Sequence, residues 1–186
     1  MRDTFKCALG MLWFATVVSA QIPSVKAYSE PDAVDVYRAL LQQQSKRSLL
    51  LLSTTVEPKV CTVKAKEITD PEFRQAMDAF HEVNEQVWEL SRTLGGLKTI
   101  SRLELNETFK PGVMEGWKRF RKNHPDSLGY IAISAIGFNG MHTVAVVYSE
   151  GRCGGKCGAG GLQYFRRTRK GWRKVNADFP RCDWIS

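Results

Sequence analysis

The segment that decides the fold covers residues 128–175 and reads LGYIAISAIGFNGMHTVAVVYSEGRCGGKCGAGGLQYFRRTRKGWRKV. Short apolar runs alternate in it with turn residues such as Asn139-Gly140 and Lys170-Gly171, a pattern typical of successive β-strands. We expect four strands, at residues 130–136, 143–148, 162–165 and 172–175. The intervals between them are too short for a crossover helix, so the strands should form an antiparallel, four-stranded C-terminal meander.

Helical patterns dominate the residues before this segment. A first helix should begin near Ser29, whose hydroxyl suits a helix N-terminus. A long second helix should start near Thr69 and continue to Gly95, because apolar residues recur at helical spacing between them. Pro111 should open a short basic helix. The first two-thirds of the chain therefore predict about three helices.

Two further strands are expected at residues 49–52 and 100–105. The helices and the antiparallel strands are segregated along the chain, which favours the α+β class. We expect about three helices packed on one face of a curved antiparallel sheet. No linker, repeat or low-complexity tract divides the chain, so residues 21–186 should form a single globular, disulfide-stapled domain.

Residues 1–20 have the pattern of a signal peptide. Arg2 and Lys6 lie beside an apolar run, and Ala20 is a small residue of the kind expected just before a cleavage site. The run is shorter than the ~20 residues that a membrane-spanning helix needs, and no later stretch is apolar enough to cross a bilayer. We expect cleavage after Ala20 and a secreted or periplasmic protein. Cleavage after Ala27 and an uncleaved N-terminal anchor are the alternatives.

The cysteines indicate disulfide bonds. Four lie beyond residue 20, namely Cys61, Cys153, Cys157 and Cys182. An even number in an exported chain favours disulfides, and four cysteines allow three pairings. The short interval between Cys153 and Cys157 favours a bridge between them, with Cys61 paired to Cys182. A zinc site is the rival interpretation, but Cys61 and Cys182 are isolated, so we expect no metal and no cofactor.

The chain is basic, with 27 Lys and Arg residues, 19 Asp and Glu residues and a net charge of +8 at pH 7. Loss of Arg2, Asp3 and Lys6 with the signal peptide lowers this charge to +7. A basic exported protein tends to meet anions, here an anionic glycan, a lipid headgroup or an acidic protein. Export argues against nucleic acid as the partner. A charge that only maintains solubility is the simpler alternative.

Basic residues concentrate around the last two expected strands, close to Tyr164, Phe165 and Trp172. Arginine beside aromatic rings suits polyanions. The glycines near the close cysteine pair could form an amide nest for an anion, although closure of a disulfide loop also explains them. Charged strands that prevent edge-to-edge aggregation need no ligand at all. The candidate ligand-binding residues are Arg152, Lys156, Arg166, Arg167, Arg169 and Lys170, with Arg173 and Lys174 beside them.

No catalytic residue is assigned from the sequence. His81 shares a helix face with Glu85, which suits acid–base or metal chemistry, but a solvated helix face explains both residues. Ser134, His142 and Asp178 could form a triad, yet the Gly-x-Ser-x-Gly motif is absent. The leading hypothesis is a non-catalytic exported protein that binds an anionic ligand or polyanion through the basic C-terminal hairpin. The alternatives are a secreted or periplasmic hydrolase that uses histidine and carboxylates in a helix/sheet cleft, and a structural envelope component.

One further pattern runs through the C-terminal half. It consists of Gly137-Phe138-Asn139, the pairs Cys153-Gly154 and Cys157-Gly158, Gly160 and Trp172. The chain resembles in this pattern a family of uncharacterised exported bacterial proteins. The resemblance implies export and a single domain. It implies no activity, because none is associated with that family.

Overall fold

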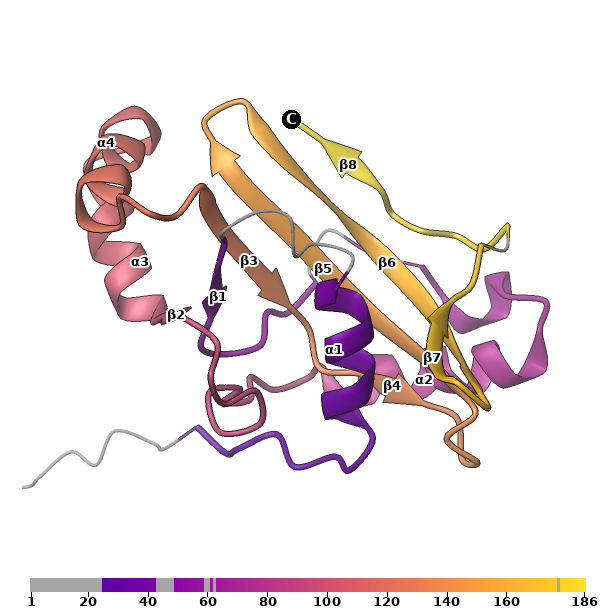
Figure 1. Cartoon of the computed structure of the whole chain (residues 1–186). Helices are drawn as coiled ribbons and strands as arrows, with labels where there is room; N and C mark the ends of the chain where they lie inside the picture. The colour runs from indigo at the N-terminus through magenta and orange to yellow at the C-terminus, as the bar shows by residue number, and fades with distance from the viewer. Residues whose placement is uncertain (1–24, 43–48, 59–60, 62, 177) are drawn as a thin grey trace, which may run out of the picture.

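The computed structural model describes residues 25–42, 49–58, 61, 63–176 and 178–186. The expected signal peptide, residues 1–20, lies outside these described residues. Figure 1 shows helices arranged around one open sheet, which confirms the α+β class. The helices are α1 (Ala33–Gln42), the 3-10 helix η1 (Ala65–Glu67), α2 (Pro71–Val83), α3 (Arg102–Phe109) and α4 (Val113–Asn123). The strands are β1 (Leu49–Leu52), β2 (Thr99–Ile100), β3 (Gly129–Ile133), β4 (Gly137–Phe138), β5 (Val144–Gly154), β6 (Cys157–Thr168), β7 (Gly171–Lys174) and β8 (Trp184–Ile185).

The sheet is mixed rather than antiparallel. Its main path runs in the order β2-β1-β3-β5-β6-β7, with β4 paired to β5 and β8 paired to β6. Strand β1 is parallel to both β2 and β3, whereas the pairs from β3 onward are antiparallel. The expectation of a wholly antiparallel sheet is therefore wrong for the N-terminal half. The long connections that leave β1 are the reason, because they carry helices and can cross over.

The β5–β6 hairpin forms the centre of the C-terminal half. Its ladder runs from the pair Val144–Arg166 to the pair Gly154–Cys157, so only Gly155 and Lys156 remain as the turn. The glycine- and cysteine-rich segment expected as a loop is thus mostly paired strand. A register shift between Arg152 and Gly154 marks a bulge near the end of the ladder.

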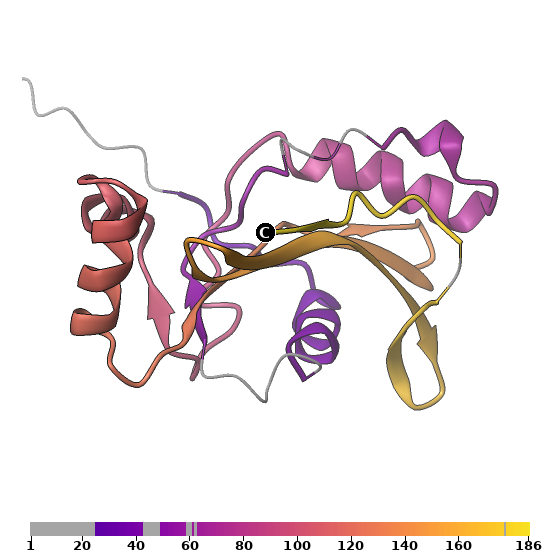
Figure 2. The same cartoon turned by 90° about the horizontal axis from the view of Figure 1, so that it is seen from above.

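The helices cover both faces of the sheet, which corrects the expectation of helices on one face. Figure 2 shows α1 and α2 on opposite sides of the β5–β6 hairpin. Val147 and Phe165 belong to the α1 side of the core, and Val146 and Tyr164 belong to the α2 side. Side chains alternate between faces along a strand, so a strand buried on both sides reads as a continuous apolar run. Around β1 and β3, α4 completes a third cluster that includes Trp117.

The end of one helix and the type of one element differ from the expectation. Helix α2 begins as predicted, because the Asp70 carboxylate accepts hydrogen bonds from two backbone amides of the first turn. It ends at Val83 instead of near Gly95, since the Asn84 side chain donates to the carbonyls of Phe80 and Ala135. Residues 102–109 form α3 rather than a strand, because the Ser101 hydroxyl caps a helix by accepting from Glu104 N.

Helix α2 lies unusually close to β4. A Cβ atom at Gly137 would overlap the α2 backbone at Ala76 and Phe80. Glycine removes that obstacle, so the helix can rest directly on the strand. The Asn84 side chain fixes the same junction by accepting a hydrogen bond from Ala135 N at 2.9 Å.

The cysteines pair as the sequence favoured. Cys61 and Cys182 lie at disulfide distance with Cα atoms 5.5 Å apart, and Cys153 and Cys157 lie at disulfide distance with Cα atoms 5.1 Å apart. Within the described ranges, no group of three or more His, Cys, Asp or Glu residues is arranged to hold a metal ion. No helix in the described part of the chain is both long and apolar enough to traverse a bilayer.

Candidate functional site

The six candidate ligand residues fall at two separate ends of the β5–β6 hairpin, whose length can be followed in Figure 1. Arg152 and Lys156 lie near the β5–β6 turn. Arg166, Arg167, Arg169 and Lys170 lie at the other end of β6 and in the turn before β7. At about 3.3 Å per residue, the ten-residue interval from Lys156 to Arg166 spans roughly 30 Å. One small anion therefore cannot contact both groups.

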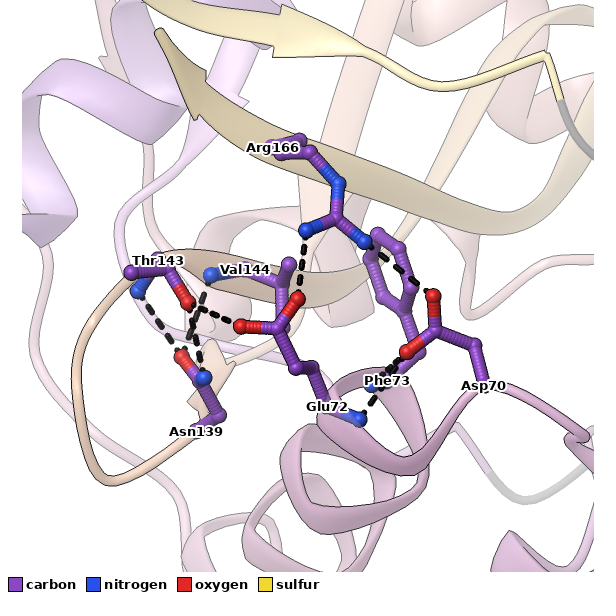
Figure 3. Close-up of polar contacts among 7 residues, drawn as sticks. All are labelled: Asp70, Glu72, Phe73, Asn139, Thr143, Val144 and Arg166. Carbon is purple, nitrogen blue, oxygen red and sulfur yellow. Dashed lines mark hydrogen bonds and ion pairs between the residues drawn. The ribbon is translucent and has the colours of Figure 1, made fainter.

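Arg166 is held by carboxylates of α2 and its N-cap, as Figure 3 shows. One guanidinium nitrogen donates to Glu72, and the other donates to Asp70 at 3.1 Å. The guanidinium also lies over the ring of Phe73, 5.1 Å from its centroid. Both acids lie at the N-terminal end of α2, where negative charge is favourable. Arg166 thus fastens this helix to the sheet, and its guanidinium is already paired with two carboxylates.

The same network continues to the β4–β5 connection. Glu72 accepts a hydrogen bond from the Thr143 hydroxyl at 2.8 Å, and the Asn139 side chain accepts from Thr143 N at 2.8 Å (Figure 3). The hydrogen bonds from Arg166 and then from Thr143 lower the pKa of Glu72. The carboxylate form of Glu72 is therefore the form that the folded protein stabilises.

Arg167 is shared between a carboxylate and an aromatic ring. Its guanidinium lies 3.5 Å from Asp32 and 6.0 Å from the ring centroid of Trp172. The same Asp32 carboxylate lies 3.0 Å from His142 Nδ1, and the His142 ring stacks on Phe138. Asp32 immediately precedes α1, so this cluster connects the start of α1 to the sheet.

Arg152 belongs to a third set of contacts, at the C-terminal strand. Its Nε atom lies 3.4 Å from Glu150, and its guanidinium lies 4.5 Å from the ring centroid of Trp184. Trp184 Nε1 donates to the Tyr148 hydroxyl at 2.9 Å. A Cβ atom at Gly160 would clash with the Trp184 indole. The glycine enrichment here lets β8 lie against β6, and the backbone of these glycines takes part in strand pairing.

Four cations of the β6–β7 hairpin are exposed and have no carboxylate partner among the described residues. They are Arg169, Lys170, Arg173 and Lys174, called the hairpin cations below. In the described part of the chain, none of these four side chains makes an ion pair or a hydrogen bond. The turn between them is ordered by the Thr168 hydroxyl, which donates to the Gly171 carbonyl at 2.7 Å and accepts from Lys170 N at 3.2 Å. Of the six candidate residues, Arg169 and Lys170 are exposed and unpaired within the described ranges, Arg167 is exposed but paired with Asp32, and exposed Lys156 lies at the distant turn.

The histidines separate into two structural residues and one that lines a cavity. His81 Nε2 lies 2.8 Å from the Val63 carbonyl, and His124 Nε2 lies 3.0 Å from Glu104. His142 lines a cavity of about 360 Å³ between α2 and the β4 region, together with Glu30 and Glu82 among others. Sequence reasoning missed the partner of His142, because Asp32 lies 110 residues away.

The triad considered from the sequence is not assembled. Ser134 is fully buried, and its hydroxyl donates to the Ala135 carbonyl and accepts from Tyr148 N. His142 pairs with Asp32 rather than with Asp178. Comparisons of the chain with protein-family models, curated proteins and solved structures found no match. The function is therefore inferred from this chain's own residues.

Proposed function

We propose that the protein is an exported, non-catalytic binding protein that holds an anionic glycan on its β6–β7 hairpin. The observation that carries this proposal is the set of hairpin cations, four exposed positive charges that no carboxylate among the described residues neutralises. Neighbouring Arg166 and Arg167 already have carboxylate partners. The expected signal peptide and the two cysteine pairs support an oxidising, extracytoplasmic location.

A repeating polyanion suits this surface better than a membrane. The hairpin cations follow one another along the turn after β6 and the strand β7, so they match a polymer with an anion on each repeat. Membrane docking usually adds exposed apolar side chains that enter the lipid. No residue between Arg167 and Lys174 is among the exposed large hydrophobic residues, and Trp172 is buried. An anionic glycan is therefore the proposed partner class, ahead of lipid headgroups and acidic proteins.

The test compares two variants that lose the same charge at different places. In the first, Arg169, Lys170, Arg173 and Lys174 are all changed to alanine. In the second, Lys118, Arg119, Arg121 and Lys122 of α4 are changed to alanine. Heparin serves as the glycan probe, and affinity is measured by titration calorimetry at several salt concentrations. The hairpin variant should bind at least about tenfold more weakly with a smaller salt dependence, whereas the α4 variant should change little.

Four results would contradict this proposal. Equal losses in the two variants would mean that only net charge matters. Binding to phosphatidylglycerol vesicles without binding to heparin would assign the hairpin to lipid headgroups, and binding to polyglutamate alone would assign it to acidic proteins. The absence of binding to all three probes would favour a structural envelope component.

A hydrolase is the second candidate, because one histidine has a catalytic arrangement. Asp32 holds His142 Nδ1, which leaves Nε2 to take a proton from water in the cavity. Among the described residues that line this cavity there is no Ser, Thr or Cys, so water would be the nucleophile. Hydrolysis of p-nitrophenyl acetate by the protein should then fall in His142→Gln. Equal rates in the two proteins would remove this candidate.

A further inference from the structure

An apolar cavity lies on the α1 side of the sheet, away from the hairpin cations. Its volume is about 410 Å³, within the range of small-molecule sites. Its walls come from one side of α1, from β1, from β3 and from residues 93–98. The apolar lining includes Leu41, Leu49, Leu51, Leu94, Leu97 and Ile131. Leu51 and Ile131 belong to the buried core, so the floor of the cavity is the core itself.

The charged residues that line this cavity, among those described, are both basic. Arg38 and Lys98 line it, and no aspartate or glutamate is among the described residues of its lining. The Arg38 guanidinium pairs with Asp35 at the exposed surface. Lys98 is exposed, and its ammonium has no carboxylate partner in the described part of the chain. Long basic side chains can line an apolar wall with their methylenes and keep the charge in water, so Lys98 places an unpaired positive charge at the rim.

We propose that this cavity binds a single-chain fatty acid, with the hydrocarbon chain inside and the carboxylate beside Lys98. The apolar walls favour a hydrocarbon, and burying it removes apolar surface from water. The ammonium at the rim provides a charge-assisted contact for a carboxylate that stays close to solvent. A small polar anion would leave the walls unfilled, and a neutral hydrocarbon would leave the ammonium without a partner.

The first experiment measures the binding of sodium octanoate, decanoate and dodecanoate to the purified protein by titration calorimetry. Affinity should rise about fourfold for each added methylene until the chain fills the cavity. Decanol should bind at least about tenfold more weakly than decanoate, because it lacks the charge. Equal affinities for decanol and decanoate, or no binding of any of these compounds, would overturn the proposal.

The second experiment uses variants around the rim. Lys98→Gln should weaken decanoate binding about tenfold, whereas the exposed control Lys66→Gln should leave it unchanged. Gly95 also lines the cavity, and a Cβ atom there would meet nothing within 4 Å. Gly95→Leu should therefore fold, as circular dichroism can check, and should block the cavity.

Unchanged decanoate affinity in folded Gly95→Leu would overturn the proposal. If that variant does not fold, Lys98→Glu decides the matter, because reversal of an exposed charge is compatible with folding and should abolish preference for decanoate over decanol. A preference for decanoate over decanol that persists in Lys98→Glu would contradict the proposed site. The variant without the hairpin cations should bind decanoate normally, which separates this inference from the glycan proposal.

Discussion

The α2 face of the sheet and the free ends of its hairpins use the same residue types in opposite ways. On the α2 face, Arg166 is held by two acids, and Cys182 packs against the core that contains its disulfide partner Cys61. At the hairpin ends, Arg169 is exposed and Cys157 closes a local loop near a turn. A positive charge or a cysteine in the sequence therefore does not reveal whether it serves the fold or faces outward.

The largest expected effect separates the two disulfides. Replacing Cys61 and Cys182 by alanine should lower the free energy of unfolding by about 5 kcal/mol, because that bridge closes a loop across 121 residues of sequence separation. Replacing Cys153 and Cys157 should cost about 2 kcal/mol, since their loop is short. Urea unfolding of the two double variants measures the difference. Equal losses of unfolding free energy in the two double variants would mean that the Cys61–Cys182 bridge stabilises the fold no more than the short Cys153–Cys157 bridge.

The next effect separates two arginines. Arg166→Ala removes the contact with Phe73 and leaves Asp70 and Glu72 without their cation. The site is partly exposed, so the loss should be about 1–2 kcal/mol, with a fall in Tm of roughly 4 °C. Arg169→Ala should stay within about 0.5 kcal/mol of the parent protein. Thermal unfolding of the two variants measures the difference, and an equal fall in Tm in Arg169→Ala would mean that the ion pairs of Arg166 add no stability of their own.

Acid should weaken the α2 face through Glu72. The pKa of this carboxyl is lowered below its ordinary value of 4.5 in the folded protein, first by Arg166 and then by Thr143. Its stabilising contribution is therefore fully present above about pH 4.5 and is lost as the pH falls through the lowered folded-state pKa. Glu72→Gln should be less stable than the parent protein at pH 7, and the gap should narrow below pH 4.5. Urea titrations across this range would show a constant gap if the pairing contributed nothing.

The smallest effect concerns single hairpin cations. Changing Arg173 alone to glutamine should leave stability unchanged, because its side chain has no ion pair among the described residues. It should reduce the slope of log affinity for heparin against log salt by about 1. The same substitution at Arg152, which pairs with Glu150, should change that slope less. Equal slopes for the two variants would mean that paired Arg152 contributes to heparin binding as much as unpaired Arg173.

Local spacing predicted the parts of the molecule that depend on neighbours in sequence. The strands of the C-terminal meander, the start of α2 and the pairing of Cys153 with Cys157 all follow from short intervals. The end of α2 did not, because Asn84 is satisfied by Ala135 across the fold. Helix α3 could have been predicted, since Ser101 and Glu104 have the spacing of a capping box.

The sequence predicted which basic residues lie in the candidate site. It did not predict which of them are already paired with carboxylates. The sequence located the basic hairpin, yet the acids that occupy Arg166 lie 94 and 96 residues away. No periodicity or motif links such distant residues. The parallel direction of β1 and the apolar cavity could not be predicted from the sequence for the same reason. Each depends on which distant segments the sheet brings together.

The close approach of α2 to β4 limits which substitutions the sequence can tolerate at Gly137. Any side chain at Gly137 would strike main-chain atoms of Ala76 and Phe80, which cannot rotate away as a side-chain tip can. A saturation mutagenesis screen scored by secretion yield should therefore reject nearly every replacement at this position, including alanine. The position contributes no functional group, so its intolerance would report the spacing between two layers. An invariant glycine in such a screen should not be taken for a binding residue.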